Sequence, residues 1–69
     1  MQYATIIEKA ADGSYSAYVP DLPGCVSCAD SPEEVKQLIQ EAIRLHIDSL
    51  RRRQEPVPEP TTIACQVQV

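Results

Sequence analysis

The stretch "DSPEEV", residues 30–35, constrains the fold most, because it carries a complete set of helix start signals. Ser31 can cap a helix, Pro32 suits the first helical position, and Glu34 follows Ser31 by three residues as in a capping box. Apolar side chains then recur at intervals of three and four residues, which predicts one amphipathic helix. Its apolar stripe consists of Val35, Leu38, Ile39, Ala42, Ile43, His46, Ile47 and Leu50.

The segment before this helix predicts a β-hairpin. In "QYATIIE", residues 2–8, apolar side chains point to both sides of an extended chain, as in a strand covered on both faces. Asp12 and Gly13 then form a pair that tolerates the backbone of a tight turn. In "SYSAYVP", residues 14–20, apolar and polar side chains alternate, so a second strand with one drier face should pair with the first.

Two further strands are expected. Prolines after residue 19 end the hairpin, since proline cannot donate to a strand ladder, and Gly24 offers a turn before a short third strand at residues 25–29. The three prolines of "EPVPEP", residues 55–60, end the helix. In "TTIACQVQV", residues 61–69, apolar and polar side chains alternate again, which predicts a half-buried fourth strand.

The predicted element order, β-β-β-α-β, indicates an α+β fold. Two antiparallel steps and one right-handed helical crossover give the spatial strand order 3-2-1-4, with the fourth strand beside the first. One helix covers only one face of such a sheet. The opposite face, including Tyr18, would be left open, so we expect a homodimer or a higher homo-oligomer.

The length of 69 residues predicts one small domain, 1–69, which buries only about 60% of the surface that its unfolded chain exposes. The sequence has no charged-then-apolar leader and no apolar run near the roughly 20 residues that a bilayer requires. Three cysteines, an odd number, do not suit a disulfide framework. We therefore expect a cytoplasmic protein with reduced thiols.

Charge is distributed unevenly along the chain. The net charge is −4, and no Lys or Arg occurs from residue 10 to residue 35. A surface of that sign repels nucleic acid and attracts basic partners. We name the carboxylates of this stretch the acidic face and predict that it binds a partner; it consists of Asp12, Asp21, Asp30, Glu33 and Glu34.

The spacing of Cys25 and Cys28 is that of half a zinc site, but a closed structural site needs four ligands. Only His46, on the apolar stripe of the helix, and Cys65, in the predicted fourth strand, remain to complete it. A redox role is also disfavoured, because neighbouring acidic residues should raise the thiol pKa values. We predict that Cys25 packs inward, that Cys28 has no special role, and that no metal or other cofactor is bound.

No arrangement of residues indicates catalysis. The serines lack a triad, since the one histidine lies in mid-helix, and two glycines cannot build a phosphate-binding loop. Most carboxylates are explained by turns and by the start of the helix. The run Arg51–Arg53 suits the negative end of the helix dipole better than a nucleic-acid site in a chain of net charge −4, and Asp48 lies one turn before Arg52. We predict a protein that is not an enzyme.

The string "YVPDLPGCVS", followed by "ADSPEEV" and the apolar helix "IQEAIRLHIDSL", resembles the HicB antitoxin family. The resemblance extends from the first strand to the end of the helix. It implies a partial RNase H-like sheet with one helix. The family turn falls on Asp21, Leu22, Pro23, Gly24 and Cys25, and the family helix cap falls on Asp30, Ser31, Glu33 and Glu34. The resemblance implies that these residues define the fold near the binding face.

The resemblance further implies a function: neutralisation of a small basic RNA-cleaving toxin of the HicA type by direct binding. An acidic surface can occupy the basic surface with which such a toxin holds RNA. The alternative is an orphan HicB-like regulatory domain that binds a small ligand or an RNA-associated partner without a toxin. A third hypothesis, weak metal-dependent nuclease activity, would depend on Asp12 or Asp21.

Two residues and one segment depart from the family pattern. Ala29 stands where the family commonly has glycine, and Ser31 replaces threonine. Many family members continue into a C-terminal DNA-binding domain, whereas this sequence ends at Val69. We therefore expect no direct DNA binding by these residues.

Overall fold

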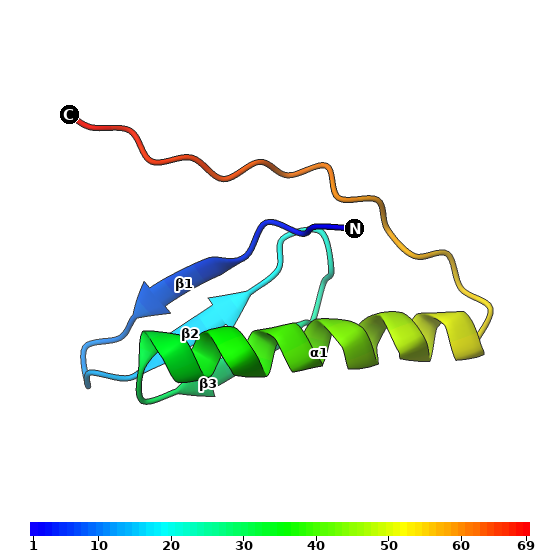
Figure 1. Cartoon of the computed structure of the whole chain (residues 1–69), viewed down its shortest axis with the longest axis horizontal. Coiled ribbons are helices and arrows are strands. Elements are labelled where there is room, and N and C mark those ends of the chain that lie inside the picture. The colour runs from blue at the N-terminus through cyan, green and yellow to red at the C-terminus, as the bar shows by residue number, and fades with distance from the viewer.

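The computed structural model describes residues 1–69 and contains a three-stranded antiparallel sheet with one helix against one of its faces (Figure 1). The strands are β1 (Ile6–Lys9), β2 (Tyr15–Tyr18) and β3 (Val26–Ala29), and the helix is α1 (Pro32–Arg52). The predicted α+β class is confirmed. The sheet order is β1-β2-β3, so the hairpin strand β2 lies in the middle.

The predicted hairpin turn is confirmed at Asp12 and Gly13. Gly13 has a φ of 90°, which only glycine adopts without strain, and Asp12 Oδ1 accepts hydrogen bonds from the backbone N–H (2.9 Å) and the hydroxyl (2.7 Å) of Ser14. Beyond the turn, Ile7 pairs with Ala17 and Ala17 pairs with Ser27. This row faces α1, because Ala17 is buried in the core.

The predicted start of the helix is also confirmed. Ser31 is the N-cap: its hydroxyl oxygen accepts a hydrogen bond from the Glu34 backbone N–H (3.2 Å), and its hydroxyl donates to the Glu34 carboxylate (3.2 Å). At the other end, Gln54 has a φ of 58° and donates its N–H to the Arg51 carbonyl, while Glu55 donates to the Leu50 carbonyl. This is a Schellman motif, so the helix ends before the first of the three prolines.

Six side chains form the core, and three of them, Val19, Leu22 and Cys25, come from the β2–β3 loop. Leu22 is fully buried and Cys25 nearly so, because the loop folds back through hydrogen bonds from the Leu22 N–H to the Val19 carbonyl (3.0 Å) and from the Cys25 N–H to the Leu22 carbonyl (3.0 Å). The positive φ of Gly24 completes this turn. The core residues outside the loop are Ala17, Val35 and Ile39.

The helix is much longer than the sheet that it covers. Its 21 residues span roughly 31 Å, whereas each four-residue strand spans about 13 Å. Both buried helix residues, Val35 and Ile39, lie in its first two turns. The second half of α1 therefore extends past the strands, as Figure 1 shows. This helix is not apolar enough to cross a membrane.

The predicted fourth strand is wrong, and with it the order 3-2-1-4 of a partial RNase H-like sheet. Residues 53–69 form no strand, although they run past the outer edge of β1 (Figure 1). We call residues 61–69 the tail. Its residues are all exposed, and none of its backbone groups bonds to β1. An alternating pattern requires a paired neighbour before it becomes a strand, and the tail has none in this chain.

The first strand is also shorter than predicted, since pairing begins at Ile6 and not at Gln2. The register explains this difference. Ile6 pairs with Tyr18, so Ala4 would stand opposite Pro20, which has no N–H to donate. Residues before Ile6 pack beside the helix without joining the ladder; Tyr3, for example, contacts the core.

Candidate functional site

Four of the five carboxylates of the predicted acidic face lie at one end of the molecule. The antiparallel strands bring the β1–β2 turn and the β3–α1 junction to the same end of the sheet (Figure 1). Tyr15 pairs with Ala29, which places Ser14, the hydrogen-bond partner of Asp12, next to Asp30. We call this region the acidic end; it consists of Asp12, Asp30, Glu33 and Glu34.

The carboxylates of the acidic end differ in whether they form hydrogen bonds or ion pairs within the chain. The hydrogen bond from the Ser14 hydroxyl, followed by that from its N–H, lowers the pKa of Asp12, and Glu34 accepts from the cap residue Ser31. Asp30 and Glu33 are exposed, and neither takes part in an ion pair or side-chain hydrogen bond. These two carboxylates are therefore free to meet a cation on another molecule.

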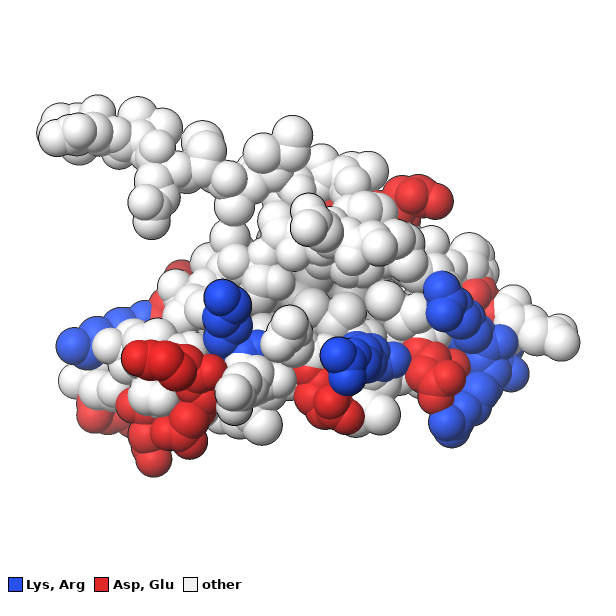
Figure 2. Space-filling view, in the orientation of Figure 1, with Lys and Arg blue, Asp and Glu red and all other residues white.

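Two lysines lie beside the acidic end in the folded protein. The sequence did not indicate this, because no Lys or Arg occurs within residues 10–35. Lys9 ends β1, with its Nζ 6.0 Å from the centre of the Tyr15 ring, and Lys36 lies in the second turn of α1. Even so, Figure 2 shows red side chains gathered where α1 begins and a blue cluster where it ends. The molecule thus has charge of opposite sign at its two ends.

Asp21 lies at the opposite end of the sheet, in the β2–β3 loop, and is not part of the acidic end. Its two carboxylate oxygens accept four hydrogen bonds: from the N–H groups of Thr61 (3.0 Å) and Thr62 (2.9 Å), and from their hydroxyls (3.2 Å and 2.7 Å). These bonds, those of Thr62 foremost, lower the pKa of Asp21. Asp21 therefore anchors the tail, a role that no local sequence signal indicated.

The three cysteines differ in burial. Cys25 is buried, as predicted, and burial raises the pKa of its thiol, whereas Cys28 and Cys65 are exposed. The expectation that Cys65 lies in a half-buried fourth strand, alternating with core residues, is wrong, because the tail forms no strand and all its residues are exposed. His46 is half-buried on α1. No three His, Cys, Asp or Glu side chains of the chain come together as a metal site would require.

The geometry also bears on the nuclease hypothesis and on the arginine run. Asp12 and Asp21 lie at opposite ends of the sheet, so they cannot act on one substrate atom. Arg52 bonds Asp48 at 2.6 Å and Arg53 bonds Glu55 at 3.3 Å, all partly exposed. The predicted pairing of Asp48 with Arg52 at the end of the helix is confirmed.

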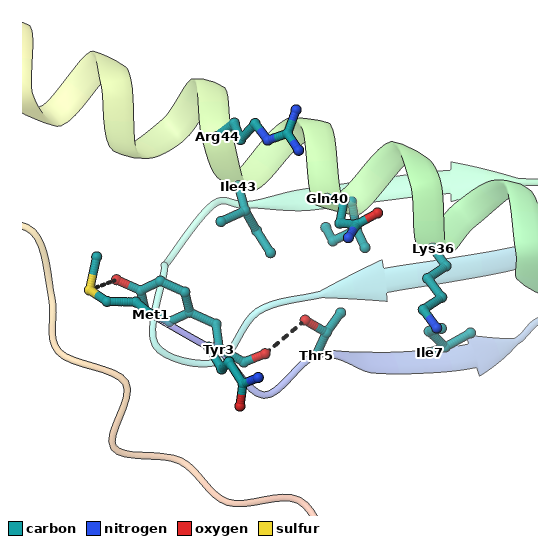
Figure 3. A pocket seen from close by; sticks show the side chains of 10 residues that line it. Met1, Tyr3, Thr5, Ile7, Lys36, Gln40, Ile43 and Arg44 are labelled. Atoms are coloured by element: carbon teal, nitrogen blue, oxygen red, sulfur yellow. Dashed lines mark hydrogen bonds between the residues drawn. The ribbon is translucent and has the colours of Figure 1, made fainter.

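A shallow groove of about 720 Å³ runs between α1 and the segment before β1 (Figure 3). Ile43 and Tyr3 face it from its two walls, and Lys36 and Arg44 lie along its helical side. A small ligand with an apolar body and a negative group would suit such a surface. The alternative function as a small-ligand regulator would use this groove, and it stays a prediction.

The helix-free face of the sheet is open, as expected from a single helix. Ile6, Tyr18 and Val26 stand opposite one another across the three strands on this face. Tyr18 is 40% exposed and Val26 is 64% exposed.

Comparison with known proteins extends the resemblance to nearly the whole chain. A UPF0150 protein of Synechocystis is 46% identical over 88% of this chain and 77% of its own length. A UPF0150 protein of Thermoplasma acidophilum is 43% identical over 84% of each chain. A 14.9 kDa protein encoded in the rep-hol intergenic region of Haemophilus phage HP1 is 40% identical over 91% of this chain, which spans 47% of that protein. Residues 3–69 match the family described as "HicB_like antitoxin of bacterial toxin-antitoxin system". The chain therefore belongs to the HicB-like antitoxin family.

Proposed function

We propose that this protein, acting as one HicB-like domain, neutralises a small basic RNA-cleaving toxin of the HicA type by binding it with the acidic end. The observation that carries the proposal is the gathering of four carboxylates at one end, of which Asp30 and Glu33 have no cation within the chain. Membership of the HicB-like antitoxin family is the basis for the proposed class of toxin. The charge pattern is the basis for the proposed contact surface.

The proposed mechanism is competition for a surface. A toxin that cleaves RNA holds the phosphate backbone with lysines and arginines. Carboxylates that enter this surface form charge-assisted hydrogen bonds with the same groups and exclude the RNA. The field of the acidic end also speeds the encounter, because opposite charges steer two proteins together before they touch. No catalytic step is needed, and the three free thiols suit action in the reducing cytoplasm.

The test removes the two free carboxylates and leaves the helix cap intact. Asp30→Asn/Glu33→Gln is co-expressed with a basic RNA-cleaving protein of the HicA type, and toxin binding and RNA cleavage are measured. We expect association to slow by roughly tenfold at low salt and by much less at high salt, since salt screens exposed charges. The control is Glu41→Gln, whose carboxylate lies on the exposed side of α1 in a 3.9 Å pair with Arg44.

Two results would contradict the proposal. One is an unchanged association rate in the double variant; the other is an equal loss in Glu41→Gln, which would indicate an effect of net charge and not of position. Circular dichroism on each variant shows that the helix has been retained.

We also propose that the protein works as a homo-oligomer. Its accessible surface is 5378 Å² for 7.6 kDa, whereas a compact monomer of that mass exposes about 4,300 Å². The excess, roughly 1,000 Å², exceeds the share of about 800 Å² that one subunit gives to an ordinary interface. The measurement is the mass in solution by sedimentation equilibrium, and a monomer at all concentrations would contradict this proposal.

A further inference from the structure

The tail is the segment that contributes most conspicuously to the excess surface. All its residues are exposed: Ile63 is 89% and Val67 is 77% exposed to solvent. The tail carries no charged residue and no proline, and its apolar and polar side chains alternate. An uncharged, extended, apolar segment with unpaired backbone groups is a strand that lacks its neighbour.

The sheet has two free edges, β1 and β3, and the tail passes beside the edge of β1. β1 pairs with β2 only, so the other edge of Ile6–Lys9 presents free N–H and C=O groups. The chain's own tail passes this edge without bonding to it. A hollow of about 410 Å³ separates Thr5–Ile7 from Ala64–Gln66.

Two anchors fix where the tail begins. Asp21 binds Thr61 and Thr62 through four hydrogen bonds, and the Tyr3 hydroxyl donates to the Pro58 carbonyl at 2.6 Å. These contacts aim the tail along β1 and hold it at a distance from that strand. The tail and the β1 edge are therefore both presented, unpaired, on the same side of the molecule (Figure 1).

We propose that residues 63–69 of one copy add as a strand to the β1 edge of a second copy, and that the second copy reciprocates. This inference gives the proposed homo-oligomer its interface and does not depend on the proposed toxin. Each copy offers one β1 edge and one tail, so a two-fold arrangement satisfies both and closes at a dimer. The exchange also covers the exposed apolar side chains of the tail and the edge of β1.

A mixed disulfide experiment tests the exchange between chains. Every chain carries Cys28→Ser. One chain, marked by a longer tag, has a new cysteine at Ile6 or Ile7 together with Cys65→Ser, and the other chain keeps Cys65. Mild oxidation should link the two chains at one of these positions and not at the other, because neighbouring strand residues face opposite sides. The control, Val26→Cys, lies on β3 at the far edge of the sheet and should not link.

A second variant tests the strand character of the tail. Val67→Pro removes an N–H and should convert the dimer to a monomer, whereas Val67→Thr keeps the N–H and the branched shape and should remain dimeric. A dimer that survives Val67→Pro would overturn the proposal and would direct attention to the open face at Tyr18. Failure of the two chains to link at either position would overturn it as well. Toxin binding by Val67→Pro separates the two proposals, since the acidic end is unchanged in that variant.

Discussion

Replacing Leu22 by alanine should remove a large part of the stability of this protein. Leu22 is 0% exposed and is one of only six buried residues. Truncating such a leucine costs about 2–5 kcal/mol through lost transfer energy and the cavity that remains. The total free energy of unfolding of a domain of this length is roughly 3–10 kcal/mol. The expected loss is therefore a large fraction of the total stability.

The assay is thermal unfolding followed by circular dichroism at one fixed protein concentration, because self-association would make the midpoint concentration-dependent. A loss of 3 kcal/mol lowers the midpoint by roughly 12–24 °C in a domain of this size. Leu45→Ala is the matched control: it is the same substitution at a residue 61% exposed on α1, and it should change stability by less than about 0.5 kcal/mol. Equal effects in the two variants would refute the assignment of Leu22 to the core. If Leu22→Ala does not fold, Leu22→Met should fold with a loss below about 1.5 kcal/mol.

Three further predictions concern single side chains. Gln54→Gly should raise stability by up to roughly 1 kcal/mol in urea denaturation, because glycine relieves the left-handed backbone at the helix end; a loss would contradict the Schellman assignment. Hydrogen bonds lower the pKa of Asp21 below its ordinary value of 3.8, so anchoring of the tail is complete above that pH and is lost as the pH falls through the folded-state pKa. The amide NMR shifts of the two bonded threonines should follow this titration and should already be displaced at neutral pH in Asp21→Ala. A thiol reagent should modify Cys28 and Cys65 quickly in the folded protein, whereas Cys25 should react only on unfolding; fast reaction of all three would show that the core is open.

The elements that the sequence predicted correctly depend on local chemistry. The helix start follows from Ser31 and Glu34, which bond each other across one turn, and the hairpin turn follows from Asp12 and Gly13. Each of these signals involves residues no more than three positions apart. The helix start and the hairpin turn therefore form regardless of how the rest of the chain folds.

The failures concern partners distant in sequence. The alternation in the tail predicted a strand, but only a neighbour with a free edge at the right distance makes one, and the anchors at Asp21 and Tyr3 place the tail too far from β1. Asp21 was assigned to the acidic face because its partners, 40 and 41 residues away, leave no local signature. Leu22 looked like part of a turn motif. Leu22 is buried because the loop folds inward, and the periodicity of apolar residues in the sequence does not indicate this.

The overhang of α1 divides the molecule into parts of unequal stability. The first turns of the helix share the core with the sheet, so their amide hydrogens should exchange only when the whole domain unfolds. Beyond the strands, no residue of the helix is fully buried, and its amides should exchange through smaller, more frequent openings. The tail follows this less protected half, while the acidic end adjoins the half of α1 that shares the core. The tail can therefore rearrange without disturbing the acidic end, toward which its last residues run back (Figure 1).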